Sequence, residues 1–134
     1  MKRLFLIISM LLCFASVESF AQNYKYMSTD FAFKIKKDNG YWSDWSDWEQ
    51  TRCLININFD REEINIYSNE PQEFTIYDWS DEERDSEGGK QLKFKCIDAN
   101  GLRCVVRVRV QSDGQMQLYV DYNDIMYVYC IEEK

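Results

Sequence analysis

The chain contains no histidine among its 134 residues. This absence excludes Ser-His-Asp and Cys-His catalysis, zinc sites with histidine ligands and an imidazole general base. Cationic residues are also scarce, since 16 lysines and arginines stand against 23 aspartates and glutamates and leave a net charge of -7. Phosphate backbones and anionic membrane surfaces would on average be repelled by this charge. We therefore expect no nucleic-acid partner.

Long apolar runs are absent outside the N-terminal end of the chain. There, two basic residues precede an apolar run over about residues 4–15, and the small-x-small triplet Ser19-Phe20-Ala21 follows. This layout is typical of a secretory signal peptide. A membrane anchor is the alternative, but the run has about 12 residues, whereas a helix needs about 20 to cross a bilayer. We therefore predict a signal peptide over residues 1–21, cleaved near Ala21, and a single secreted or periplasmic β domain over residues 22–134 with no stable membrane span.

Helical periodicity is also lacking over any long stretch, and apolar side chains instead alternate with polar ones at the period of a β-strand. An eighth predicted strand, over residues 126–132, is apolar on both faces, so its orientation stays open. The side chains expected to face inward, strand by strand, are Phe31, Phe33 and Ile35; Cys53, Ile55, Ile57 and Phe59; Ile64 and Ile66; Phe74 and Ile76; Leu92, Phe94 and Cys96; Leu102, Cys104, Val106, Val108 and Val110; and Met116, Leu118, Val120 and Tyr122.

The order of these strands predicts an all-β fold. Strands with one dry and one wet face are typical of antiparallel sheets, and mostly short connections favour a meander of about eight strands. Closing such a meander removes the exposed edges of the sheet. We therefore expect a small up-and-down barrel or half-barrel, with a sandwich of two sheets as the alternative.

The turn between two of the strands predicts their register. A two-residue Asn-Gly turn would pair the apolar face of one strand with the polar face of the other, because a slip of one residue turns every side chain over. A three-residue loop, Ala99-Asn100-Gly101, with Gly101 in the left-handed conformation, avoids this conflict. In that register Asp98 faces Leu102, and Cys96 faces Cys104.

The predicted mature chain keeps four cysteines, which allow three complete pairings. The register brings Cys96 and Cys104 together, so a disulfide between them and a pair of buried thiols are both open. A bridge between Cys53 and Cys130 requires their strands to be neighbours, which no local pattern supports. Without Cys-x-x-Cys spacing or histidine, we expect no catalytic role for these thiols.

The connection over about residues 37–50 carries a tryptophan repeat. Trp42, Trp45 and Trp48 recur at every third residue, with Tyr41 in front of them and Ser-Asp pairs between them. The Ser-Asp pairs are able to cap a turn of α-helix or of 3₁₀-helix, and a 3₁₀ turn would stack the three indoles on one face.

The repeat has three interpretations. One or two of the indoles cover the open end of the core, or the indoles form a surface that contacts a ligand or glycan. In the third interpretation they form a cation–π ladder with arginines on an outer strand face, as in the thrombospondin type 1 repeats that the spacing resembles. The triplet Gly40-Tyr41-Trp42 also matches the G-x-W of lipocalins. The arginines available for a ladder are Arg103, Arg107 and Arg109.

Several short motifs together resemble small exported proteins of Bacteroidales bacteria. These motifs are the Ser-Phe-Ala-Gln end of the predicted signal peptide, the Trp-Ser-Asp-Trp segment, Phe94–Asp98 and Gln117–Asp121. The resemblance implies an exported all-β protein without an assigned activity. It supplies no catalytic or binding residue.

These patterns predict a non-enzymatic exported protein that binds a small apolar ligand or a glycan through the open end of the barrel and the tryptophan segment. The alternative is a protein interaction module or secreted inhibitor that uses the same aromatic residues. We expect no cofactor, metal site or catalytic residue. Asp121 and Asp124 fit turn polarity better than acid–base work, and the acidic connection over about residues 79–89 lacks the spacing of an EF-hand calcium loop. The oligomeric state stays open.

Overall fold

The structure is a computed structural model that describes residues 23–134, so the predicted signal peptide lies outside the described residues. All regular structure in this range is β-strand. No helix in the described range is long and apolar enough to cross a membrane. The strands are β1 (Asn23–Ile35), β2 (Glu49–Gln50), β3 (Leu54–Asn58), β4 (Glu63–Tyr67), β5 (Gln72–Trp79), β6 (Glu83–Arg84), β7 (Lys90–Asp98), β8 (Arg103–Val110), β9 (Met116–Asp121) and β10 (Ile125–Glu133).

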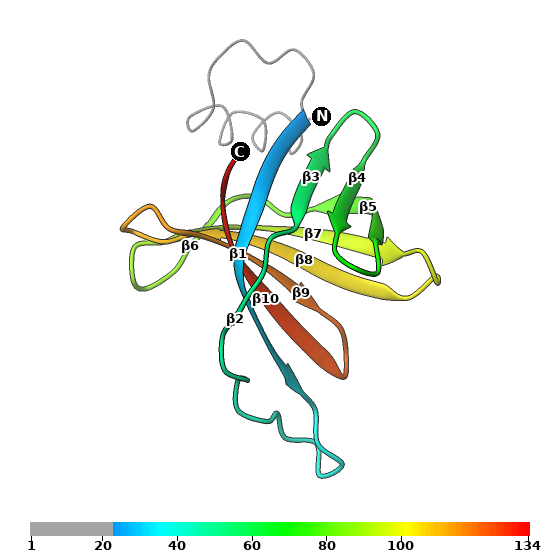
Figure 1. Ribbon diagram of the computed structural model, residues 1–134, viewed down its shortest axis with the longest axis vertical. Coiled ribbons are helices and arrows are strands. Elements are labelled where there is room, and N and C mark those ends of the chain that lie inside the picture. The colour runs from blue at the N-terminus through cyan, green and yellow to red at the C-terminus, as the bar shows by residue number, and fades with distance from the viewer. Residues whose placement is uncertain (1–22) are drawn as a thin grey trace.

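Eight of these strands form a closed antiparallel barrel (Figure 1). They follow the order β1, β3, β4, β5, β7, β8, β9 and β10, and β10 then pairs with β1 to close the sheet. The two-residue strands β2 and β6 add to the edges of β1 and β7. The predicted meander and barrel are confirmed, and the two-sheet sandwich is wrong.

The predicted register between β7 and β8 is also confirmed. Cys96 lies directly opposite Cys104. The N–H of Asp98 donates to the carbonyl of Leu102 at 2.9 Å, and the N–H of Gly101 donates to the carbonyl of Asp98 at 3.0 Å. Gly101 has a φ of 84°, which a side chain at this position would strain.

The inward side chains of β3 to β9 fill the barrel. This fits the dimensions of an eight-stranded barrel, whose interior is about wide enough for side chains alone. On β10, the tyrosines Tyr127 and Tyr129 point toward the core, which settles the orientation that the sequence left open. The interior is therefore a packed core; its side chains with at most 2% exposure include Ile55, Ile57, Ile64, Ile66, Phe74, Ile76, Leu92, Phe94, Cys96, Val106, Leu118 and Val120.

The first strand differs from its prediction. It begins at Asn23, and its N-terminal part buries Tyr24 and Tyr26, which the sequence analysis did not assign to a strand. A register shift between Ser28 and Asp30 marks a β-bulge, which moves the inward positions from even to odd numbers. The bulge hides the period-two pattern, so only the part after it was recognisable.

Three side chains predicted to face the core are exposed. Leu102 is 58% exposed because it lies in the turn at the rim of the barrel, where the wall no longer covers it. Phe33 and Ile35 are 37% and 48% exposed because β1 continues past the point where β3 leaves it. For these three positions the predicted burial is wrong.

All four cysteines of the described residues are free thiols. Cys96 and Cys104 are buried opposite each other, as the register predicted, but no disulfide joins them. Cys53 and Cys130 are half-buried and also free. Of the two states that the sequence left open, the structure contains the buried thiols.

A matched pair of leucines tests the packing of the barrel. We expect Leu118→Ala to lower the free energy of unfolding by about 2–5 kcal/mol, because this fully buried side chain leaves a cavity. Leu102→Ala should change it by no more than about 0.5 kcal/mol, because its side chain is already in solvent. Urea unfolding measures both free energies. An equal loss of stability in the two variants would contradict the placement of Leu102 at the rim and of Leu118 in the core.

Thiol reactivity tests the buried cysteines. Burial raises the pKa of Cys96 to about 12 and that of Cys104 to about 11. Since the thiolate is the reactive form, iodoacetamide should modify these two thiols slowly in the folded protein at pH 8 and rapidly after unfolding. Stability should fall as the pH rises above the ordinary thiol pKa, because the unfolded chain ionises first. If Cys96 and Cys104 stay unmodified when the protein is unfolded in the absence of reductant, the free-thiol state is contradicted.

Candidate functional site

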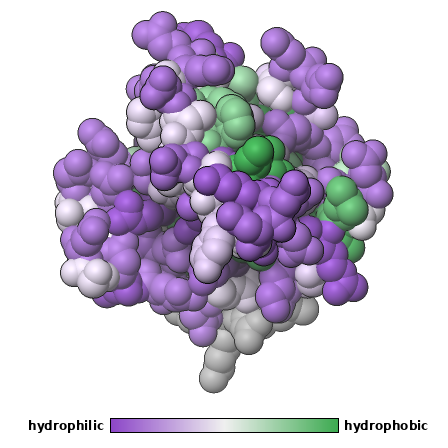
Figure 2. Space-filling model, turned by 90° about the horizontal axis from the view of Figure 1, so that it is seen from below, coloured by the Kyte–Doolittle hydropathy of each residue, from purple (hydrophilic) through white to green (hydrophobic). Residues whose placement is uncertain are grey.

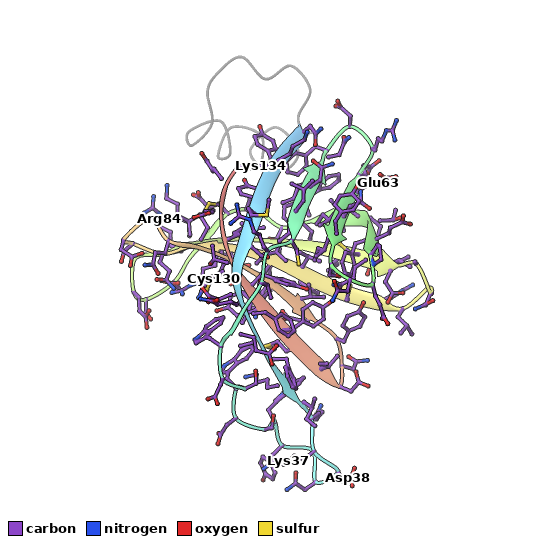
Figure 3. All side chains as sticks on the ribbon, in the orientation of Figure 1. Lys37, Asp38, Glu63, Arg84, Cys130 and Lys134 are labelled. Carbon is purple, nitrogen blue, oxygen red and sulfur yellow. The ribbon has the colours of Figure 1, made fainter. Side chains whose placement is uncertain are left out.

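A projecting arm carries the tryptophan repeat. It consists of the C-terminal part of β1, from Phe31, and the segment that folds back along it to Gln50; we call residues 31–50 the aromatic arm. Figure 1 shows it extending below the barrel, and Figure 3 places Lys37 and Asp38 at its tip. Beyond the barrel, β1 therefore has β10 on one side and residues 42–50 on the other.

Two serines hold the returning segment against β1. Ser43 donates its N–H to the carbonyl of Ile35 at 2.8 Å, and its Oγ accepts the N–H of Ile35 at 3.0 Å. Ser46 makes the same pair of bonds with Phe33, at 2.8 and 2.9 Å. In each pair the serine hydroxyl takes the place of a backbone carbonyl.

The three-residue spacing of the repeat follows from this pairing. Ser43 and Ser46 are three residues apart in the segment, whereas their partners on β1, Ile35 and Phe33, are two residues apart. The next pair, Glu49 with Phe31, continues the same step. Residues 42–50 are thus extended, and we call them the strap. The predicted 3₁₀ turn is wrong. Ser43 and Ser46 supply a hydroxyl acceptor at two of these positions, Glu49 occupies the third, and the residue in front of each position carries an indole.

The strap places two indoles over the outer wall of the barrel. The Nζ of Lys34 lies 4.7 Å from the ring centroid of Trp45 and 5.7 Å from that of Trp42. The Nζ of Lys36 lies 5.8 Å from the ring centroid of Trp42. The indoles therefore do have cationic partners, but these are Lys34 of β1 and Lys36 just after it, and not the arginines that the sequence suggested.

A row of outward side chains on the barrel wall includes the ring that Trp45 contacts. Ala32, Val128 and Tyr119 are neighbours across β1, β10 and β9. Ala32 and Val128 are only 1% and 2% exposed although they face outward, and Trp45 packs edge-on against Tyr119 with ring centroids 6.3 Å apart. We infer that the indole of Trp45 covers the two small side chains and anchors the strap to the wall.

Arg107 reaches this cluster through Tyr119. Its guanidinium carbon lies 4.2 Å from the ring centroid of Tyr119, and its Nη2 donates to the carboxylate of Asp121 at 3.1 Å. Arg107 is therefore one contact away from Trp45. Asp121 is held in this ion pair on the outer wall.

The other two arginines lie elsewhere. Arg103 stacks on Tyr77 at 5.8 Å. Arg109 donates to the carboxylate of Asp85 at 2.9 Å and to that of Glu87 at 3.3 Å, both in the acidic connection. The hydrogen bond from Arg109 is the main cause that lowers the pKa of Asp85. The proposed ladder of Trp42, Trp45 and Trp48 with all three arginines is not formed.

The open end of the barrel beneath the arm is filled. Phe31 packs on Tyr129 and Tyr127, with ring centroids 5.1 and 5.9 Å apart. The side-chain amide of Gln72 bridges the two hydroxyls, since its Nε2 donates to Tyr129 at 3.2 Å and its Oε1 accepts from Tyr127. Burial raises the pKa of both tyrosines. This cluster plugs the end through which the sequence predicted ligand entry.

The arm exposes apolar and aromatic side chains on two of its faces. Tyr41 is 73% exposed, Trp45 41% and Trp48 54%, and on the inner side Phe33 and Ile35 add to them. Figure 2 views the molecule from the side of the arm and shows hydrophobic atoms between polar ones. Single exposed apolar residues are ordinary, whereas a gathered set marks a contact surface.

The four residues predicted as ligand contacts, Tyr41, Trp42, Trp45 and Trp48, all lie on the arm. Sequence reasoning missed their supports, Lys34, Lys36 and Tyr119. The signal for the lysines was present, because both are polar-face positions of the alternating pattern that precedes the repeat. The contact between Trp45 and Tyr119 joins residues far apart in the sequence, so no local pattern indicates it.

The chemistry available on the arm is contact chemistry. The exposed indole of Trp48 and the exposed carboxylates of Asp44 and Asp47 can stack and form hydrogen bonds, while the ammonium groups of Lys34 and Lys36 lie over Trp42 and Trp45. Within residues 23–134 no group of three or more cysteine, aspartate or glutamate side chains is arranged to hold a metal ion.

Reciprocal serine variants test the strap. In Ser46→Ala we expect amide hydrogen exchange to accelerate about tenfold at Phe33, because its N–H loses an acceptor. Ser43→Ala should do the same at Ile35 and leave Phe33 unchanged. Asp44→Ala, an exposed neighbour, is the control. Equal exchange at both amides in both variants would contradict the pairing.

Comparison with known proteins gives no match to a family model, to a curated protein or to a solved structure. The resemblance to exported Bacteroidales proteins stays a prediction. Function therefore has to be inferred from the residues of the arm and of the barrel wall.

Proposed function

We propose that this protein is an exported, non-enzymatic binding module that holds a glycan against the aromatic arm. The observation that carries this proposal is the exposure of Trp45 and Trp48 on a backbone segment that paired serine bonds fix to β1. Indole faces stack well on the apolar faces of sugar rings. Export is supported by the signal-peptide pattern of residues 1–21.

The strap lowers the cost of binding. A loop that is already ordered loses little conformational freedom when a ligand arrives. The exposed residues Asp44 and Asp47 alternate with the indoles and offer acceptors for hydroxyl groups. Stacking faces with polar groups between them match a sugar chain better than they match a purely apolar molecule.

The filled interior favours this surface over an internal site for a small apolar ligand. Leu118 and Val120 are fully buried in the middle of the barrel, and the cluster of Phe31, Tyr127 and Tyr129 occupies its end. A lipocalin-like chamber would require many of these side chains to move. The glycan is therefore the better of the two ligands that the sequence suggested.

A second candidate function is a protein interaction module or secreted inhibitor. The observation that favours it is the exposure of Phe33 and Ile35 on the inner side of the arm. An aliphatic side chain such as Ile35 offers little to a sugar and much to the apolar centre of a protein interface. The two candidates thus use different faces of one arm.

Indole truncation tests the glycan. With a panel of soluble oligosaccharides as probes, calorimetry should show that Trp48→Ala weakens binding by about tenfold or more, because it removes a stacking face. Trp45→Ala should weaken binding at least as much, because it removes a ring and also the contact with Tyr119 that anchors the strap. Tyr77→Ala, an exposed aromatic on the outer face of β5, is the matched control and should bind as the original chain does.

The inner face separates the two candidates. Phe33→Ser should leave oligosaccharide affinity unchanged if the glycan lies on the indoles. An effect of Phe33→Ser with none from Trp48→Ala would favour a protein partner and overturn the glycan proposal. Thermal unfolding of every variant shows whether the fold is retained.

A further inference from the structure

A polar groove lies on the outer surface of β3, β4 and β5, away from the arm. It has a volume of about 300 Å³. Figure 3 labels one of its residues, Glu63, at the upper right, whereas Lys37 and Asp38 at the tip of the arm lie at the bottom. The side chains that line it include Asn56, Asn58, Asn65, Glu63, Glu73 and Tyr67.

The groove is built from two adjacent rungs of the sheet. In one rung Asn56, Asn65 and Glu73 are neighbours across β3, β4 and β5, and in the other Asn58 lies beside Glu63. Neighbouring strands are about 4.8 Å apart. The amide and carboxylate groups therefore place several hydrogen-bond donors and acceptors close together on paired strands.

Asparagine is an unusual choice for these positions. It is depleted in β-strands, yet three of the outer positions of Leu54–Asn58 and Glu63–Tyr67 are asparagines, each next to an isoleucine that is at most 1% exposed. The Oδ1 of Asn56 is buried without a hydrogen-bond partner. Buried polar atoms are normally paired, so the Asn56 amide would gain an acceptor bond if its side chain turned toward a ligand hydroxyl in the groove.

The charge of the groove selects the kind of ligand. Glu63 and Glu73 face a single cation in the lining, Arg61. The excess of carboxylates would repel an anionic ligand such as a phosphate, whereas it would not repel a neutral ligand. Planar amides and carboxylates can donate to and accept from neighbouring hydroxyl groups, and Tyr67, 52% exposed at one side, offers a ring face.

We propose that this groove binds a ring of a neutral saccharide through the asparagine side chains, with Tyr67 against one face of the sugar. The inference rests on the groove alone and stands whether or not the aromatic arm binds a glycan. If both hold, the protein contacts sugar at two separate places on its surface.

The test follows the side-chain amide resonances of the three asparagines in a ¹⁵N-labelled sample. The probes are maltotetraose, cellotetraose and mannotetraose as neutral saccharides and sialyllactose as an anionic one. At about 10 mM, at least one neutral probe should shift the resonances of Asn56, Asn58 and Asn65, since this concentration exceeds a millimolar Kd about tenfold. Sialyllactose should shift them less.

Two groove variants and two controls complete the test. Asn65→Asp keeps the size of the side chain and removes its N–H donors. It should lower the affinity for the neutral saccharide that binds best by at least about fivefold. Asn56→Val should abolish binding and raise the melting temperature, because it removes an unpaired buried carbonyl; a merely structural asparagine would lower it. Lys95→Ala on the outer face of β7 and Trp48→Ala on the arm should leave the shifts unchanged.

Two results would overturn the proposal. One is the absence of shifts at the groove asparagines with every neutral probe. The other is binding that survives Asn65→Asp and is lost in Trp48→Ala, which would assign the saccharide to the arm alone and leave the proposed function intact.

Discussion

The backbone of β1 beyond the barrel needs a second partner, and this requirement shapes the molecule. A strand with an unpaired edge can pair with another chain and aggregate. β3 pairs with β1 only as far as Met27. The rest of that edge is covered by a strap in which Ser43 and Ser46 supply both a donor and a hydroxyl acceptor. Ser28 forms the same reciprocal pair with Cys53, so the device recurs at the bulge. The exposed aromatic surface is a consequence of how this edge is covered.

Much of the barrel was predictable because its walls follow one simple rule. Side chains alternate between a packed interior and solvent, and the turn at Gly101 admits a single register consistent with that alternation. The failures have physical causes of their own. A bulge near Ser28 breaks the alternation in β1, and the rim position of Leu102 keeps the sequence pattern of a buried residue without the wall that would bury it.

The site was half predictable for a related reason. The indoles stand out in the sequence, but a three-residue period also fits a 3₁₀ turn, and nothing local shows that it matches two residues of a neighbouring strand. Lys34, which lies over Trp42 and Trp45, belongs to β1, and Tyr119, which packs against Trp45, belongs to the distant strand β9. Because the core is full, the chemistry that remains for function lies on the outside, with aromatic rings on the arm and amides in the groove of β3 to β5.

The central claim is that the serine-held strap makes the arm a pre-formed binding surface. The most direct measurement is the oligosaccharide affinity of the double variant Ser43→Ala, Ser46→Ala, in which every indole is still present. If the strap pre-organises the indoles, the affinity falls although no aromatic contact is removed, and the loss grows with temperature as the strap detaches. An affinity equal to that of the original chain would contradict the account.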